Sequence, residues 1–108
     1  MAWNIILFES NRGEKPVEEF TYSLDELTIP KINHHVRLLI RFGPWLGMPY
    51  SKKLTNSLYE LRIRGKQEIR IIYSFKGRNI YLLHAFKKQT QKIPNKEIKI
   101  AQKRLDMI

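Results

Sequence analysis

The pattern of apolar and polar positions predicts a strand and two helices in the first half of the chain. Residues 3–8 form a short, almost unbroken apolar run rich in β-forming side chains, which predicts a buried strand. Residues 16–27 open with a proline and then repeat apolar side chains at helical spacing. Residues 28–42 do the same, up to a glycine–proline pair that commonly ends a helix. We therefore expect two short helices in a hairpin, followed by a loop over residues 43–53.

Alternation of apolar and polar side chains replaces the helical spacing in the second half. Residues 59–64 and residues 69–75 alternate on either side of a turn that contains Gly65, which predicts a β-hairpin with one apolar face. A second turn leads to a third strand over residues 80–86, and residues 94–105 return to helical spacing with lysines on the polar side. Helices at the two ends and strands between them predict an α+β fold.

Length and composition favour one domain spanning residues 1–108. A chain of this size with 43% hydrophobic residues can bury one core without disulfides or metals. It has no cysteine, which fits a reducing compartment such as the cytoplasm and excludes disulfides, thiolate zinc sites and cysteine nucleophiles. Three histidines without carboxylates at ligand spacing predict no metal site. The first apolar run is too short for a signal peptide or a membrane span.

The net charge of +10 lies in the second half of the chain. Residues 1–51 hold five Lys or Arg against six Asp or Glu, whereas residues 52–108 hold fifteen against four. Such one-sided basicity is typical of a protein that meets polyphosphate, because each cation placed on a phosphate releases condensed counterions. A generic basic surface, or one that meets an acidic protein, is the alternative.

Pairing across the predicted hairpin brings cations together. If the loop is residues 65–67, Arg62 lies directly opposite Arg70 on the polar face. Like charges in such a pair destabilise a sheet unless a carboxylate or an external anion compensates them, and phosphate is the obvious anion. The same register puts Arg70 near Ala85 with Lys87 further along that face, and a bulge would exchange Lys87 for Lys88. Either lysine completes a three-cation cluster able to stabilise charge on a transferring phosphoryl group.

Each of these residues also has a plain structural interpretation. Glu60 lies on the same face and could bridge both guanidinium groups, or the register could slip so that the arginines never meet. Lys87, Lys88 and Lys92 could be a solvated charge run. His84, expected on the apolar side of its strand, is more often a satisfied core residue than a general base.

Several segments of the second half together resemble a known family. They are LYELR at residues 58–62, RIIY at 70–73, LLHAFKK at 82–88 and QKIP at 91–94, followed by Glu97, Ile98 and Ala101. The sequence is similar, over nearly its whole length, to the phage-derived branch of the RelE/HigB toxin superfamily. The resemblance implies a small antiparallel sheet with two N-terminal helices on one face and a C-terminal helix. It also implies cleavage of mRNA in the ribosomal A site without a cofactor, restrained by an antitoxin that is typically a helix-turn-helix protein.

The resemblance also implies site residues. By motif position, Arg62, Arg70 and Lys88 match the basic active-site residues, with Lys87 as the alternative lysine. The tyrosine that some members carry in the C-terminal segment is absent, and Ile93 replaces a helix-capping Thr or Ser, which costs about 1 kcal/mol if nothing else caps the helix. Further candidates for RNA binding are Lys53, Arg64, Lys92, Lys96 and Lys99, and candidates for proton transfer are His84, Tyr73 and Glu60.

The hypothesis from the sequence is metal-free attack of the RNA 2′-hydroxyl on its adjacent phosphate, with cationic side chains stabilising the charge that develops. Two alternatives stay open. One is a non-nucleolytic toxin of the related RelE/ParE fold that binds DNA gyrase. The other is a basic nucleic-acid-binding module without catalysis.

Overall fold

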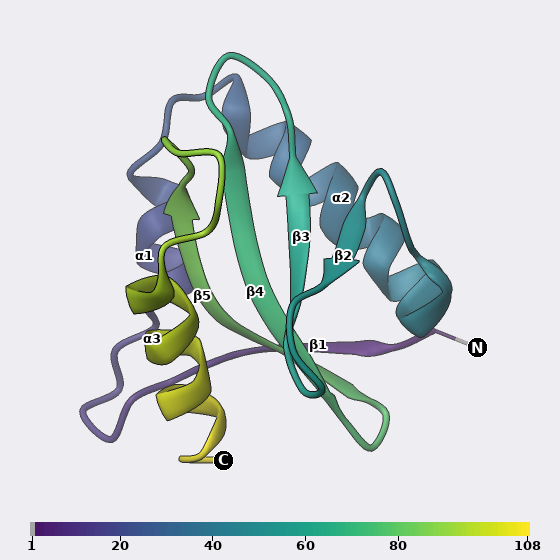
Figure 1. The fold of residues 1–108 in the computed structure, drawn as a ribbon, viewed down its shortest axis with the longest axis vertical. Helices are drawn as coiled ribbons and strands as arrows, with labels where there is room; N and C mark the ends of the chain where they lie inside the picture. Colours follow the sequence, from purple (N-terminus) through teal and green to yellow (C-terminus); the bar gives the residue numbers. More distant parts are fainter. Residues whose placement is uncertain (1) are drawn as a thin grey trace.

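The computed structural model describes residues 2–108, in which a five-stranded sheet has two helices on one face and one on the other (Figure 1). The strands lie in the order β1-β5-β4-β3-β2. Neighbours from β2 to β5 are antiparallel, whereas β1 runs parallel to β5 at one edge. The strands are β1 (Asn4–Leu7), β2 (Ser51–Lys53), β3 (Tyr59–Ile63), β4 (Ile69–Lys76) and β5 (Asn79–Lys87). The α+β class is confirmed, but the sheet is mixed because the first strand pairs with the last.

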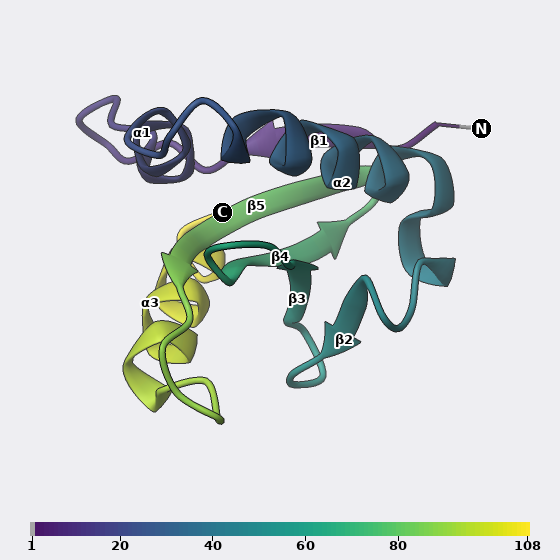
Figure 2. The ribbon, with the colours of Figure 1, turned by 90° about the horizontal axis from the view of Figure 1, so that it is seen from above.

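The helices form two separate layers. They are α1 (Pro16–Tyr22), α2 (Thr28–Phe42) and α3 (Asn95–Leu105), with a short 3-10 turn η1 (Gly43–Trp45) after α2. Figure 2 shows α1 and α2 above the sheet and α3 on its other side. Val17, Ile32 and Leu39 pack on the first face, whereas Ala101 of α3 packs on the second with Phe8 and other apolar residues. The expected helices are therefore present, each holding its apolar side against the sheet.

Two details near the N-terminus differ from the prediction. The strand expected over residues 3–8 is present as β1, but at the edge of the sheet its side chains are at most half-buried. The first helix ends at Tyr22 rather than at Leu27, whose side chain is 81% exposed. The cause is Asp25, whose Oδ1 accepts hydrogen bonds from the backbone and the hydroxyl of Thr28 and so starts α2.

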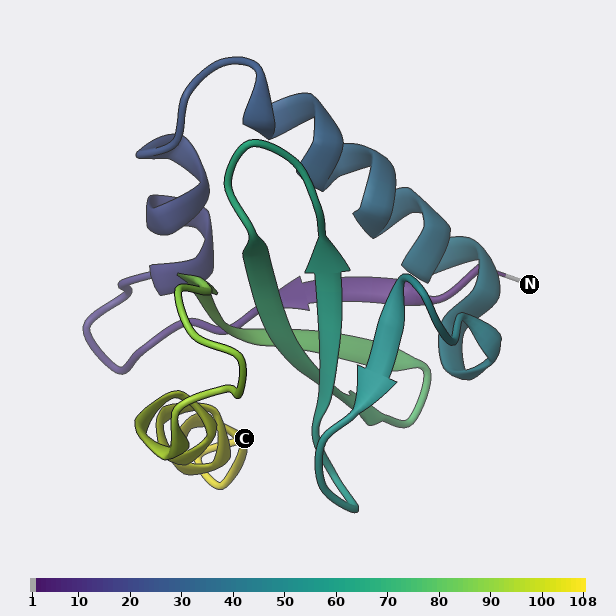
Figure 3. The same ribbon diagram turned by 45° about the horizontal axis from the view of Figure 1, so that its top comes forward.

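The segment expected as a loop over residues 43–53 ends in a strand, β2, that was not predicted. β2 lies along β3 beside the C-terminal end of α2 (Figure 3), and Lys52 and Lys53 are exposed on it. Its sequence lacks apolar alternation, so the periodicity gives no strand signal. Backbone pairing with β3 and a hydrogen bond between the Ser51 and Tyr73 hydroxyls hold it in place.

The predicted hairpin register is confirmed, and Arg62 lies opposite Arg70. The next pairing, between β4 and β5, shifts by one residue beyond Ile72, so that Arg70 faces Phe86 rather than Ala85. A bulge of this kind moves every following side chain to the other face of the strand. It turns His84 onto the face of Arg70 and makes Lys88, not Lys87, the lysine that continues that face.

Gly43 ends α2 where the N-terminal segment crosses it. Its φ of +50° lies in the left-handed region, and a Cβ added there would lie 2.3 Å from Nε1 of Trp3. The backbone amide of Trp3 in turn donates to Ile40 O at 3.0 Å. A side chain at Gly43 would therefore push the indole away from the end of the helix.

We expect Gly43→Ala to lower the free energy of unfolding by about 2–4 kcal/mol, because strained backbone and overpacking against Trp3 add together. Gly47→Ala is the matched control, since nothing lies within 4 Å of its added Cβ. Urea denaturation of both variants measures the difference. Equal stabilities would contradict this account of the helix end.

Candidate active site

A carboxylate lies between the two facing arginines. Glu60 Oε1 is 3.7 Å from Arg62 Nε, and Glu60 Oε2 is 3.7 Å from Arg70 Nε. Glu60 is only 3% exposed, so its carboxylate is shielded from water. Glu60 is thus the bridging carboxylate that the sequence offered as the alternative to an external anion. Its presence and the binding of a phosphate concern the same two arginines.

Arg70 is the most deeply buried member of this group, at 1% exposure. Its Nη2 donates to Glu68 Oε1 at 3.2 Å and its Nη1 donates to Ile69 O at 3.1 Å. Within the described chain, however, Nε of each arginine and Oε2 of Glu60 lack a hydrogen-bond partner. Glu60 therefore compensates charge without satisfying the buried donors, which is unusual for polar groups in a protein interior.

Lys88 joins the arginines at the end of β5. Its backbone amide donates to Glu68 O at 2.7 Å, which fixes the chain next to the hairpin. Burial and the positive charge of Arg70 lower the pKa of Lys88 below its ordinary value, and Arg62 adds to this. We call Arg62, Arg70 and Lys88, with Glu60 and Glu68, the cationic cluster. It holds three cations against two carboxylates.

Lys87 and Lys53 lie elsewhere. Lys87 is exposed opposite Ile69 and, one position before Lys88, lies on the other side of the strand. Lys53 pairs with Tyr59 on the face of α2, so its neighbour Lys52 pairs with Glu60 on the face of the cationic cluster. Lys52 is not recognisable as a candidate from the sequence, because nothing in it reveals the β2 register.

The remaining basic candidates lie on exposed segments. Arg64 lies at the hairpin tip with Nη1 3.8 Å from Glu68 Oε1, and a Cβ on Gly65 would lie 2.7 Å from Lys31 Nζ, so α2 brings another cation to this tip. Lys92, Lys96 and Lys99 are exposed on the loop before α3 and along that helix. A shallow hollow beside Lys88 is lined by Glu68, Lys88, Gln89, Thr90 and Gln91.

His84 has a partner for each of its ring nitrogens and lies among packed side chains. Its Nδ1 accepts from Arg104 Nη1 at 3.3 Å, its Nε2 lies 2.9 Å from Glu97 Oε1, and its ring stacks on Phe86. One nitrogen that accepts and one that donates describe a neutral imidazole. Burial lowers the pKa of His84, although Glu97 acts to raise it. Both partners belong to α3, which covers the ring.

Tyr73 and Ile93 also serve the packing. Tyr73 lies on the α2 face with its hydroxyl bonded to Ser51, and burial raises its pKa to about 12. It therefore lies across the sheet from the cationic cluster. No side chain caps the start of α3 at Pro94, but Ile93 packs against the apolar cluster around Leu58, which offsets the missing cap.

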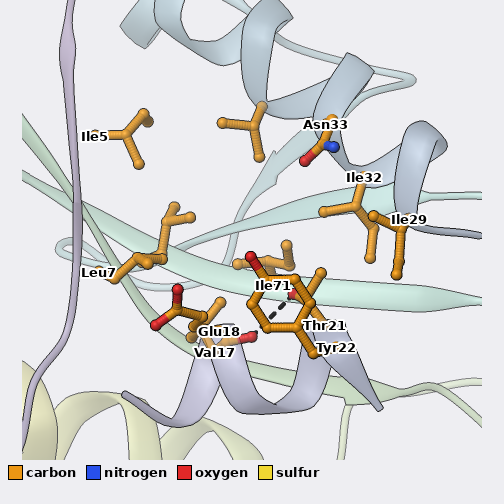
Figure 4. A pocket seen from close by; sticks show the side chains of 12 residues that line it. Ile5, Leu7, Val17, Glu18, Thr21, Tyr22, Ile29, Ile32, Asn33 and Ile71 are labelled. Atoms are coloured by element: carbon orange, nitrogen blue, oxygen red, sulfur yellow. Dashed lines mark hydrogen bonds between the residues drawn. The ribbon is translucent and has the colours of Figure 1, made fainter. Parts of the chain in front are cut away.

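A separate cleft opens on the opposite face of the sheet (Figure 4). It lies between α1, α2 and the sheet and is mostly apolar, with Ile32 and Ile71 among its lining residues and Glu18, Thr21 and Asn33 as its polar ones. Within residues 2–108, no group of three or more His, Cys, Asp or Glu side chains is placed to hold a metal ion. None of the described helices is long and apolar enough to cross a membrane.

Comparisons with known proteins place the sequence and the fold. The model of the family described as phage derived protein Gp49-like (DUF891) matches residues 19–106. No curated protein matches the chain. A chain in the crystal structure of the heterotetrameric YoeB–YefM toxin-antitoxin complex from Staphylococcus aureus is 22% identical, with a TM-score of 0.54 over 83% of this chain and 100% of that one. At this identity, the likeness establishes a shared fold.

We expect Glu60→Gln to lower the free energy of unfolding by about 3 kcal/mol, because it leaves the buried Arg70 guanidinium without half of its compensating charge. Glu9→Gln is the control, since Glu9 and Lys15 form an exposed pair worth under about 1 kcal/mol. Thermal and urea denaturation report both values. A Glu60→Gln variant as stable as the wild type would show that the carboxylate is not needed between the arginines.

We expect His84→Gln to flatten the pH dependence of stability. With the folded pKa of His84 below the ordinary 6.5, the unfolded chain takes up the proton first as pH falls. The wild type should therefore lose stability as pH drops below about 6.5 and until the lowered pKa is passed. Unfolding free energies at pH 8 and pH 5 measure the loss in each protein, and the same loss in both would contradict the prediction.

Proposed function

The chain belongs to the family of phage-derived Gp49-like proteins, and we propose that it is the toxin of a type II toxin-antitoxin pair, an endoribonuclease of the RelE/HigB type. Residues 1–108 act as one toxin domain. A toxin-antitoxin complex contains a chain of the same fold, which supports the toxin role. The chemistry of the cationic cluster supports the reaction, since fold alone does not fix activity.

The observation that carries this proposal is that Arg62 and Arg70 flank Glu60 on neighbouring strands, while the register of β5 puts Lys88 on the same face of the sheet. The positive excess of the cationic cluster suits a phosphate. Arg70 is too buried to contact RNA directly. It acts from the protein interior, through its positive potential and by holding Glu68. Arg62 and Lys88 contact the phosphate.

The proposed reaction is an in-line displacement on one phosphodiester. The 2′-oxygen attacks phosphorus, the bond to the 5′-oxygen breaks, and the products are a 2′,3′-cyclic phosphate and a free 5′-hydroxyl. Arg62 holds a non-bridging oxygen, and Lys88 passes its proton to the leaving 5′-oxygen, a step that its lowered pKa favours. The 2′-hydroxyl proton passes to water. Positioning of the substrate supplies much of the rate.

The proposed partners follow from the same surface. The substrate is mRNA in the ribosomal A site, so the protein acts in the cytoplasm, and exposed Arg64, Lys92, Lys96 and Lys99 contact ribosomal RNA phosphates. An antitoxin, of the helix-turn-helix class, holds the toxin inactive. Lys52, opposite Glu60, joins the RNA-binding set.

We expect Lys88→Gln to slow mRNA cleavage about 100- to 1,000-fold, the usual loss when one stabilising donor is removed. Lys87→Gln is the matched control, because that lysine is adjacent in sequence but points away from the cationic cluster. Primer extension on a reporter mRNA after induced expression, together with growth, measures the cleavage.

Each rival function has its own result in this experiment. Growth arrest with intact transcripts and damaged DNA in the wild type would favour a gyrase-binding toxin. Intact transcripts without growth arrest would leave a nucleic-acid-binding module. Equal cleavage by Lys88→Gln and Lys87→Gln would remove Lys88 from the mechanism.

A further inference from the structure

A cluster of exposed apolar side chains lies between α2 and β2. Phe42, Trp45, Met48 and Tyr50 are 41%, 81%, 62% and 42% exposed, although large apolar side chains are normally buried. We call residues 42–50, with these four side chains, the aromatic loop. Exposed apolar surface concentrated in one segment marks a binding surface more often than scattered exposure does.

The aromatic loop is attached to the cationic cluster. Arg62 Nη1 donates to Met48 Sδ at 3.4 Å, and the Arg62 backbone amide donates to Tyr50 O at 2.8 Å. Met48 therefore lies beside the guanidinium that would hold the phosphate, and the Arg62 side chain keeps 13% of its surface exposed. A phosphate at Arg62 would bring the rest of its nucleotide against Met48 and Tyr50.

Basic residues outnumber acidic ones around the aromatic loop, where Glu60 beside Arg62 is the nearby carboxylate. Residues 27–59 contain five Lys or Arg and no Asp or Glu. The Arg41 guanidinium lies over the Phe42 ring at 5.4 Å, and the His35 ring meets Tyr50 edge-on at 5.9 Å. Such a surface suits a ligand that offers flat apolar faces and negative charge at regular spacing. Single-stranded RNA does so, with a base and a phosphate in every nucleotide.

We propose that the aromatic loop binds unpaired bases flanking the phosphate held at Arg62, and that it selects the position of cleavage. The inference rests on the proposed function, because the phosphate at Arg62 fixes which bases reach the loop. Tyr50 and Trp45 supply stacking surfaces, and Met48 separates them from the reacting phosphate. An aromatic ring can stack on any base, so the loop fixes the position of the strand with little sequence dependence. Bases that stack more strongly are bound more tightly, which gives a modest preference among cleavage positions.

The contribution of the bases to RNA binding can be measured apart from that of the phosphates. Fluorescence anisotropy follows the binding of two labelled hexamers, one of 2′-O-methyl RNA and one with the same 2′-O-methyl sugars and phosphates but no bases. Wild type should bind the hexamer with bases more tightly, and Tyr50→Ala and Trp45→Ala should each lose about 5- to 100-fold for that hexamer with little change for the abasic one. Tyr22→Ala is the matched control, an exposed tyrosine on α1 at 72% exposure. It should bind both hexamers like the wild type.

The outcomes distinguish this inference from the nuclease proposal. Neither hexamer can be cleaved through a 2′-hydroxyl, so base-dependent binding in a protein without nuclease activity would overturn the proposed reaction and keep the loop as an RNA surface. Equal binding of both hexamers by the wild type, or no loss in Tyr50→Ala, would overturn the inference. So would a Tyr50→Ala variant that binds RNA normally but no longer binds an acidic protein partner. Primer extension should, in addition, show altered cleavage positions for Tyr50→Ala and unaltered ones for Tyr22→Ala.

Discussion

Two arginines that face each other across β3 and β4 are the constraint around which the second face of the sheet is organised. A like-charged cross-strand pair cannot be buried alone, so carboxylates must accompany it. Glu60 lies between Arg62 and Arg70, and Glu68 holds the far end of Arg70. Two carboxylates accompany three cations, so the arrangement compensates most of the charge and keeps a positive excess toward an anion.

The C-terminal helix covers the apolar part of the same face. Ala101 of α3 packs there with Ile72 and Phe86, and side chains of α3 hold His84. The cationic cluster lies on this face next to the apolar layer. Low polarity beside the arginines strengthens their field, which is also why Lys88 loses part of its affinity for a proton.

A one-residue bulge in β5 connects the two parts. It sets His84 and Phe86 beneath α3 and sends Lys88 toward Arg70, whereas an unbroken register would have sent Lys87. At the sheet edge formed by β2, Lys52 lies opposite Glu60. The aromatic loop precedes this strand and contacts Arg62 through Met48. The cationic cluster thus depends on irregular features, which local patterns encode weakly.

Local patterning alone predicted the helices at residues 28–42 and 94–105, the hairpin and the basic second half. With the turn placed at residues 65–67, it also predicted the register that pairs Arg62 with Arg70, because each of these features follows from periodicity or turn position within one segment. Tertiary structure decided the parallel pairing of β1 with β5, the strand β2, the placement of Lys88 rather than Lys87 on the face of Arg70, and the burial of Arg70 and Tyr73 on opposite faces. These depend on contacts between residues distant in sequence, and no local period records which segment will cover a face or where a strand will bulge.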